Sequence, residues 1–294
     1  MSHPEDDSEI EASRAPLMEH LVELRRRLIV CAAALAVGFF FCFYFSQDIY
    51  FLLLRPFEVG ARLLAAQKSA GGHGSLDLLL TLLGLKSAPA ATQHLKLVFT
   101  APLEFFFTKV KLAGFGAVVI AFPVLAWQLY RFVAPGLYKR ERGAFLPFLI
   151  ASPVLFLMGA ALVYYIMLPF VLWFSLNQQI LGGGPGDVSV ELLPKLSDYM
   201  SLVTTLVLAF GLCFQLPVVL SLLGMAGVVT ASMLRSGWRY AVVGVFAVAA
   251  VVTPPDPISM LSLALPICLL YFASILCVQV IEWRRAKDDQ VPSP

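Results

Sequence analysis

The feature that most constrains the fold is the apolar run of residues 29–45, which contains no Asp, Glu, Lys or Arg. A helix needs about 20 apolar residues to cross the hydrocarbon core of a bilayer, and this run is close to that length. The charged segment 17–28 directly precedes it and ends with three consecutive arginines, Arg25, Arg26 and Arg27. We interpret 17–28 as an amphipathic helical head at the cytoplasmic membrane surface, because Lys and Arg accumulate on that side.

Composition extends this interpretation to the whole chain. The 294 residues are 59% hydrophobic and 14% charged, and the mean hydropathy is +0.82. The apolar runs do not alternate with a period of two, so membrane helices are expected rather than a β-barrel. The net charge of +2 is close to neutral and does not indicate a nucleic-acid-binding surface. We therefore expect an all-α integral membrane protein.

The apolar runs predict six spans. Their expected ranges are Ile29–Phe45, a second span from the Thr100–Glu104 helix start to Trp127, Phe145–Leu176, Ser197–Leu223 with Ser197 as its cap, Trp238–Val252 and Ile258–Ile281. The third exceeds the usual length and is expected to tilt, bend or project from the bilayer. The fifth and sixth are expected to be short and to form a closing hairpin, with the fifth the shorter arm. In the first outward connection we expect short interfacial or cap helices at Asp48–Leu54 and Leu76–Leu85.

This division predicts a cytoplasmic N-terminal segment (1–27), a six-helix membrane domain (28–281) and a cytoplasmic tail (282–294). The segments assigned to the cytoplasm hold 13 Lys and Arg, against one in the 177–196 loop and none in 253–257. The stretch 46–111 holds seven but is too long to weigh in the charge rule. Both termini are therefore expected on the cytoplasmic side.

Two cytoplasmic clusters place a carboxylate among arginines. Glu23 has Arg26 and Arg27 at helical spacing, and Glu141 lies between Arg140 and Arg142. One interpretation is a helix-surface ion pair, which contributes about 0.2–0.5 kcal/mol. The other is a pair of acceptors for a cationic partner, because a carboxylate binds a guanidinium through two charge-assisted hydrogen bonds of about 1.5–3 kcal/mol each.

Four segments in this order resemble the signature segments of the TatC family, the polytopic receptor of the twin-arginine protein translocase. They are His20-Leu-Val-Glu-Leu-Arg-Arg-Arg27, Phe132-Val-Ala-Pro-Gly-Leu-Tyr-Lys-Arg-Glu141, Phe210-Gly-Leu-Cys-Phe-Gln-Leu-Pro217 and Thr253-Pro-Pro-Asp256. The resemblance runs from about Leu17 to Ile281. It implies a protein that docks the Arg-Arg signal peptides of folded precursors on its cytoplasmic face.

The resemblance also implies roles for individual residues. Glu23 and Glu141 match the family's acceptors for the twin arginines, and Arg25 and Phe132 match neighbouring positions needed for docking. A planar guanidinium suits a carboxylate better than the point charge of an ammonium. Phe132 would offer an aromatic face to an arginine, or would instead be an ordinary aromatic residue of the membrane interface.

Three further positions match ones that the family needs for transport or partner binding. Pro56 lies in the first outward connection, and Asp256 stands before Pro257, where it would also serve as the N-cap of the last span. Gln215 replaces a glutamate common in the family, so a mechanism with a titrating proton at this point is not expected. Its amide would hydrogen-bond either within the chain or to a partner helix.

The resemblance implies TatB-like and TatA-like single-span partners, precursor proteins, membrane lipid, self-association and an inner membrane energised by the proton-motive force. No catalytic or cofactor motif occurs, and the five cysteines lie in apolar runs without metal-ligand spacing, so neither an enzyme nor a cofactor is expected. A secondary transporter is the alternative, but we find no half-to-half repeat and almost no charge within the spans. An intramembrane enzyme would need a catalytic pair that neither Gln215 nor Cys213 has.

Overall fold

The computed structural model describes residues 4–69, 97–98, 100–133, 145–178, 194–252 and 257–288. Every regular element in these ranges is a helix, and an isolated β-bridge joins Val98 to Lys195. The helices are α1 (Pro4–Tyr44), α2 (Ser46–Ser69), α4 (Glu104–Val133), α5 (Phe145–Leu162), the π-helix η3 (Val163–Met167), α6 (Leu168–Asn177), α7 (Leu196–Cys213), α8 (Leu216–Met225), α9 (Ala231–Ser236), α10 (Trp238–Val252) and α11 (Pro257–Asp288).

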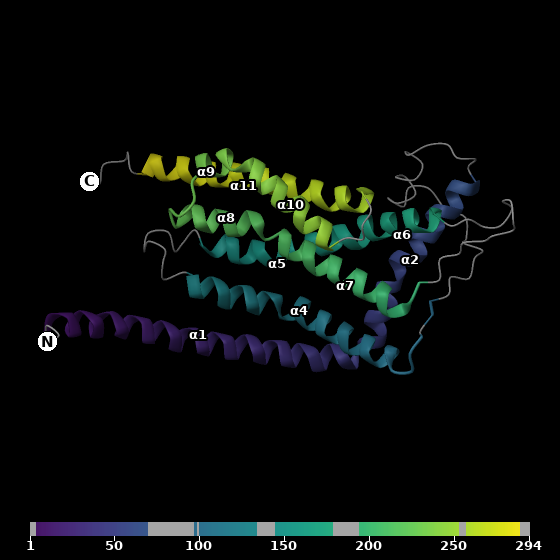
Figure 1. The fold of residues 1–294 in the computed structure, drawn as a ribbon, viewed down its shortest axis with the longest axis horizontal. Coiled ribbons are helices and arrows are strands. Elements are labelled where there is room, and N and C mark those ends of the chain that lie inside the picture. Colours follow the sequence, from purple (N-terminus) through teal and green to yellow (C-terminus); the bar gives the residue numbers. More distant parts are fainter. Residues whose placement is uncertain are drawn as a thin grey trace.

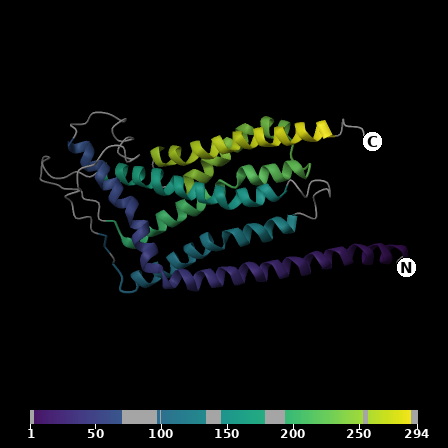
Figure 2. The ribbon, with the colours of Figure 1, turned by 180° about the vertical axis from the view of Figure 1, so that it is seen from behind.

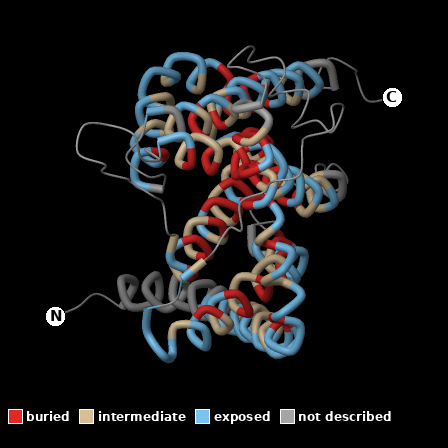
Figure 3. Tube along the Cα trace, turned by 90° about the vertical axis from the view of Figure 1, so that its right-hand side faces the viewer, coloured by how far each residue is buried: buried red, intermediate tan, exposed pale blue. Residues whose placement is uncertain are grey.

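The long helices lie side by side in a row (Figure 1). α1 packs along α4 at one edge, α4, α5 and α7 form the middle, and α8, α10 and α11 form the other edge. The start of α1 and the end of α11 lie at the same end of the row, and α2 crosses the opposite end (Figures 1 and 2). Buried residues concentrate in the middle of the row (Figure 3).

Five stretches are long and apolar enough to cross a membrane. They are Leu21–Tyr44, Glu104–Arg131, Phe148–Asn177, Leu196–Met225 and Met260–Arg284. These correspond to five of the six expected spans, and the expected fifth span coincides with α10, a shorter apolar helix. The prediction of a short sixth span is wrong, because Met260–Arg284 is a full-length stretch of 25 residues within α11. The all-α membrane fold is therefore confirmed, and the amphipathic head proves continuous with the first span in α1.

The long third span contains a wide turn rather than a simple tilt. Between α5 and α6 the backbone forms the π-helix Val163–Met167, where the N–H of Leu168 donates to the carbonyl of Val163. Pro169 follows and has no N–H to offer the carbonyl one turn earlier, so the α-helical hydrogen-bond ladder is already interrupted there. The third span thus stays helical, while its backbone hydrogen bonds change from the α-helical to the π-helical spacing just before Pro169.

The expected fourth span is present as Leu196–Met225, and it divides into α7 and α8 at Phe214–Gln215. Pro217 lacks the N–H that would bond to the carbonyl of Cys213, which ends the first segment. The expected cap at Ser197 is wrong. Lys195 occupies the N-cap position without a side-chain hydrogen bond, and the backbone N–H of Ser197 donates to Glu104 Oε1 at 3.2 Å.

Glu104 stabilises the starts of two helices at once. Its Oε2 accepts hydrogen bonds from the backbone N–H groups of Thr100 (2.7 Å) and Ala101 (3.2 Å), just before α4. Its Oε1 reaches the first turn of α7 through Ser197. A carboxylate also interacts favourably with the positive end of a helix dipole. One side chain therefore fixes α4 and α7 relative to each other at this end.

The first outward connection begins with a longer helix than expected. α2 runs for 24 residues and passes through Pro56, whereas the sequence predicted a short helix ending near Leu54. The second expected short helix, Leu76–Leu85, lies outside the described residues.

Candidate functional site

The site begins with Glu23 at the end of the row where α1 lies against α4. The Glu23 carboxylate forms an ion pair with the guanidinium of Arg27 one turn later, and Arg27 Nε donates to Glu23 Oε1 at 3.1 Å. Arg27 Nη1 also donates to the backbone carbonyl of Gln128 on α4, at 3.4 Å. Arg27 thus joins the acidic side chain to the neighbouring helix.

The two side chains of this ion pair differ in solvent exposure. The side chain of Arg27 is 14% exposed, whereas that of Glu23 is 39% exposed. The helix-surface ion pair that the sequence allowed is therefore present, and the Glu23 side chain stays partly exposed within it. Arg25 and Arg26 are exposed beside it, and Arg131 is exposed on the last turn of α4.

The last turn of α4 lies at this same end of the row (Figure 2). Phe132 belongs to the last turn of α4, but the placement of its side chain is not described. Glu141 and Asp256 lie outside the described residues. The structure thus brings Glu23 and the backbone of Phe132 to one end of the bundle, and the pairing of Glu23 with Glu141 stays a prediction. α11 begins at Pro257, in agreement with the expected helix start.

Pro56 lies at the opposite end, with a fully buried ring. In an α-helix the carbonyl of Leu52 would accept the N–H of residue 56, which proline lacks. The hydroxyl of Tyr164 on η3 donates to this carbonyl instead, at 2.7 Å. The hydroxyl of Tyr199 on α7 donates to the adjacent carbonyl of Leu53, also at 2.7 Å. Two tyrosines therefore attach α2 to the third and fourth spans where its own hydrogen bonding is incomplete.

Removing the buried hydroxyl should weaken this attachment. Tyr199 is 4% exposed, so the Tyr199→Phe protein should leave the Leu53 carbonyl without its second partner and lose about 0.5–1.5 kcal/mol of unfolding free energy. Thermal unfolding in detergent measures the change. Tyr240→Phe is the matched control, since Tyr240 is 83% exposed. Equal melting temperatures for both variants and the unmodified protein would contradict this role of Tyr199.

Gln215 lies in the middle of the row and is buried at 7% exposure. Its Nε2 donates to the backbone carbonyl of Ser152 on α5 at 2.9 Å, and its Oε1 accepts from Ser152 Oγ at 2.6 Å. The hydroxyl of Tyr130 on α4 donates to the same Ser152 Oγ at 3.0 Å. Of the two alternatives for Gln215, the bond within the chain is therefore present. A contact with a partner helix stays a prediction.

Several of these residues were not identified from the sequence. Tyr164 and Tyr199 were missed because their partners are backbone carbonyls. Ser152 was missed because it is a small polar residue in an apolar run, and Tyr130 because it follows the expected end of the second span. One signal was available for Tyr164: a proline inside a helix frees the carbonyl four residues earlier, and in hydrocarbon that carbonyl needs another donor.

No group of three or more His, Cys, Asp or Glu side chains that could hold a metal ion occurs among the residues the structure describes. All five cysteines are free thiols. The candidate site consists of the partly exposed Glu23 carboxylate and Arg27, with the exposed cations Arg25 and Arg26 on α1 and Arg131 on the last turn of α4.

A row of long apolar helices with a charged end defines a multi-span α-helical membrane protein. The family model described as Sec-independent protein translocase protein (TatC) matches residues 19–266. The chain belongs to the TatC family.

Individual relatives agree with this assignment. The Sec-independent protein translocase protein TatC of Magnetococcus marinus is 40% identical over 276 residues, covering 94% of this chain and 88% of the relative. That of Helicobacter pylori strain J99 is 34% identical over 265 residues, covering 90% and 89%. Two crystal structures of the twin-arginine translocase receptor TatC are similar. One has a TM-score of 0.66 at 31% identity and covers 89% of this chain and 98% of that chain. The other, in DDM, has a TM-score of 0.67 at 32% identity and covers 87% and 98%.

Proposed function

We propose that the chain is the receptor subunit of a twin-arginine translocase and binds the Arg-Arg signal peptides of folded precursors. The observation that carries the proposal is the partly exposed Glu23 carboxylate at the end where α1 meets α4. Arg27 shares its hydrogen bonds between this carboxylate and the Gln128 carbonyl, so Glu23 is oriented before any peptide arrives. Preorganisation of this kind lowers the entropic cost of binding.

Glu141 supplies the second acceptor in this proposal, with Arg25 and Phe132 as neighbouring docking positions. A signal-peptide guanidinium binds the partly exposed Glu23 carboxylate through charge-assisted hydrogen bonds. The exposed cations Arg25, Arg26 and Arg131 surround the Glu23 carboxylate with positive charge at this end of the row. Two adjacent arginines therefore fit better than a single one, and better than lysines, whose point charge forms no planar pair of bonds.

The remaining parts of the proposal concern topology and partners. We place six spans in a bacterial inner membrane with both termini in the cytoplasm, which agrees with the start of α1 and the end of α11 lying at one end of the row. TatB-like and TatA-like single-span proteins are the proposed partners, with Pro56, Gln215 and Asp256 contributing to transport or partner binding. Several copies associate in the receptor complex, and the proton-motive force drives export.

The decisive experiment is crosslinking of a precursor from a photoreactive residue at Leu24, an exposed neighbour of Glu23. Glu23→Ala and Glu141→Ala should each lower the yield with an Arg-Arg precursor on the order of ten- to a hundredfold, because each removes a charge-assisted contact. A Lys-Lys precursor should give a similarly low yield with the unmodified protein.

Glu58→Ala is the matched control, since Glu58 is an exposed acid on α2 at the opposite end of the row. It should leave crosslinking unchanged. Membrane insertion of every variant is checked in parallel by resistance to alkaline extraction. Undiminished crosslinking in an inserted Glu23→Ala, Glu141→Ala double variant would remove the proposed site.

A further inference from the structure

Two adjoining cavities open at the end of the row where α1, α2 and α4 meet. The first, of about 170 Å³, lies between α2 and α4 and is lined by Gln47, Tyr50, Phe51, Phe105, Thr108, Lys109 and Leu112. The second, of about 480 Å³, is lined by Phe40, Phe43, Tyr44, Ser46, Gln47 and Lys109. Gln47 and Lys109 belong to both, so these two polar side chains stand at the boundary between two largely aromatic chambers.

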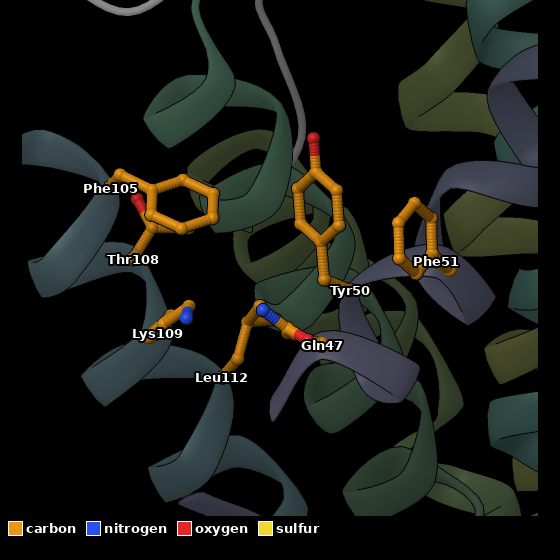
Figure 4. A pocket seen from close by; sticks show the side chains of 7 residues that line it. All are labelled: Gln47, Tyr50, Phe51, Phe105, Thr108, Lys109 and Leu112. Carbon is orange, nitrogen blue, oxygen red and sulfur yellow. The ribbon is translucent and has the colours of Figure 1, made fainter. Parts of the chain in front are cut away.

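The close-up in Figure 4 shows how the two helices contribute to the first cavity. Phe105 and Lys109 of α4 lie across from Gln47 and Tyr50 of α2. The Lys109 Nζ lies 5.0 Å from the centre of the Phe105 ring. The ring of Tyr50 meets that of Phe105 edge to face, with centroids 6.1 Å apart. The walls are therefore largely apolar, and the Lys109 ammonium lies against the Phe105 ring.

The aromatic residues around the cavities mark this level as a bilayer interface. α1 ends in the segment Phe39-Phe-Phe-Cys-Phe-Tyr44, and α4 begins with Phe105, Phe106 and Phe107. Tyrosine side chains are enriched where hydrocarbon meets headgroups, and Tyr44 and Tyr50 line the cavities among these phenylalanines. Lys109 lies just over one turn inside the start of α4, a position from which a lysine extends its ammonium to the headgroup layer.

The charges favour an anionic occupant. Among the described residues, no carboxylate lies within ion-pair distance of Lys109, and the acids nearest to the lining residues in sequence, Asp48 and Glu104, line neither cavity. Lys111, two residues later, differs: its Nζ donates to Ser201 Oγ on α7 at 3.3 Å. Lys109 is thus a half-buried cation among aromatic rings without an acidic partner in the described chain.

We propose that this corner binds a membrane phospholipid, whose phosphate contacts the Lys109 ammonium and the Gln47 amide while an acyl chain lies along the aromatic walls. An ammonium and an amide donate hydrogen bonds to phosphate oxygens, and the Phe and Tyr rings supply an apolar surface for the chain. The lipid fills the space between α2 and the α1–α4 pair and so supports the outward corner of the bundle.

Native mass spectrometry of the full chain tests the site, with phosphatidylglycerol added to the detergent-purified protein. Lys109→Gln should lower the fraction of protein that retains a lipid roughly fivefold, because one basic residue near an anionic headgroup contributes on the order of that factor. Lys111→Gln is the matched control and should retain lipid as the unmodified protein does. Phe105→Ala should also lower retention, by removing one wall of the first cavity.

Two outcomes would overturn the proposal. Equal retention by the Lys109→Gln and Lys111→Gln proteins would place the lipid elsewhere. Displacement of the lipid by inorganic phosphate would show an anion site that needs no acyl chain. The measurement involves no signal peptide, so its result is independent of the Glu23 experiment.

Discussion

Gly211→Ala should destabilise the protein by about 1–3 kcal/mol, because the crossing of α5 and α7 has no room for a methyl group. A Cβ at Gly211 would lie 2.5–2.9 Å from three ring carbons of Phe156. That ring cannot withdraw, since Phe156 is 1% exposed and stacks on Phe122 of α4, with centroids 4.0 Å apart. The unfolding free energy in detergent, or the yield of monodisperse protein, measures the loss.

Gly114→Ala provides the matched control for this substitution. Gly114 lies inside α4, and a Cβ there meets nothing within 4 Å. An alanine in a helix interior is favoured over glycine by roughly 0.5–1 kcal/mol, so this variant should be neutral or slightly stabilised. Adding Phe156→Leu to Gly211→Ala should recover part of the loss, because the two positions are coupled. Equal stability of Gly211→Ala and Gly114→Ala would refute the close crossing.

Gln215→Leu should lower the unfolding free energy by about 1–2 kcal/mol, since it removes both amide bonds to Ser152 in the buried middle of the row. Tyr130→Phe removes the other bond to Ser152 Oγ. The double variant should lose less than the sum of the single losses, because both act on one hydroxyl. Thr205→Val, at an exposed position of α7, is the control and should be close to neutral.

The same Gln215→Leu protein separates internal packing from partner binding. Our proposed function expects weaker co-purification of the single-span partners, beyond what the stability loss causes. Unchanged recovery of the partners from a destabilised Gln215→Leu protein would confine Gln215 to packing within the chain. An unaltered melting temperature would instead contradict the bonds to Ser152.

The spans were predictable because length and hydropathy alone define a helix in hydrocarbon. α10 has the expected bounds, and α1, α4 and α11 extend beyond their apolar runs only into flanking segments. The interruptions were harder to locate. Pro153 and Pro217 both lie within spans, yet only the second coincides with a break between α-helices. Whether a proline breaks the helix depends on which hydrogen-bond donors the neighbouring helices supply to the freed carbonyl. A single sequence does not contain that information.

The candidate site was predictable in part. Glu23 and its ion pair with Arg27 follow from helical spacing, whereas the bond from Arg27 to the Gln128 carbonyl joins residues that are 101 positions apart. The contacts of Glu104 were also predictable only where they are local. Its position before an apolar run indicates a helix start, but its contact with Ser197 depends on the packing of α4 against α7. Interactions between residues one helical turn apart can be predicted from the sequence. Contacts between distant segments cannot.

The prolines also bear on the order in which the bundle assembles. Of the five long apolar stretches among the described residues, Leu21–Tyr44 alone contains no proline, and it has the smallest buried share, 11%. Its backbone can bond entirely to itself, so in lipid it is self-sufficient as soon as it is inserted. The stretches with η3 and with the Phe214–Gln215 break depend on neighbours such as α2 and α5 to complete their polar contacts. Of the five stretches, the one that comes first along the chain therefore depends least on its neighbours for backbone hydrogen bonds.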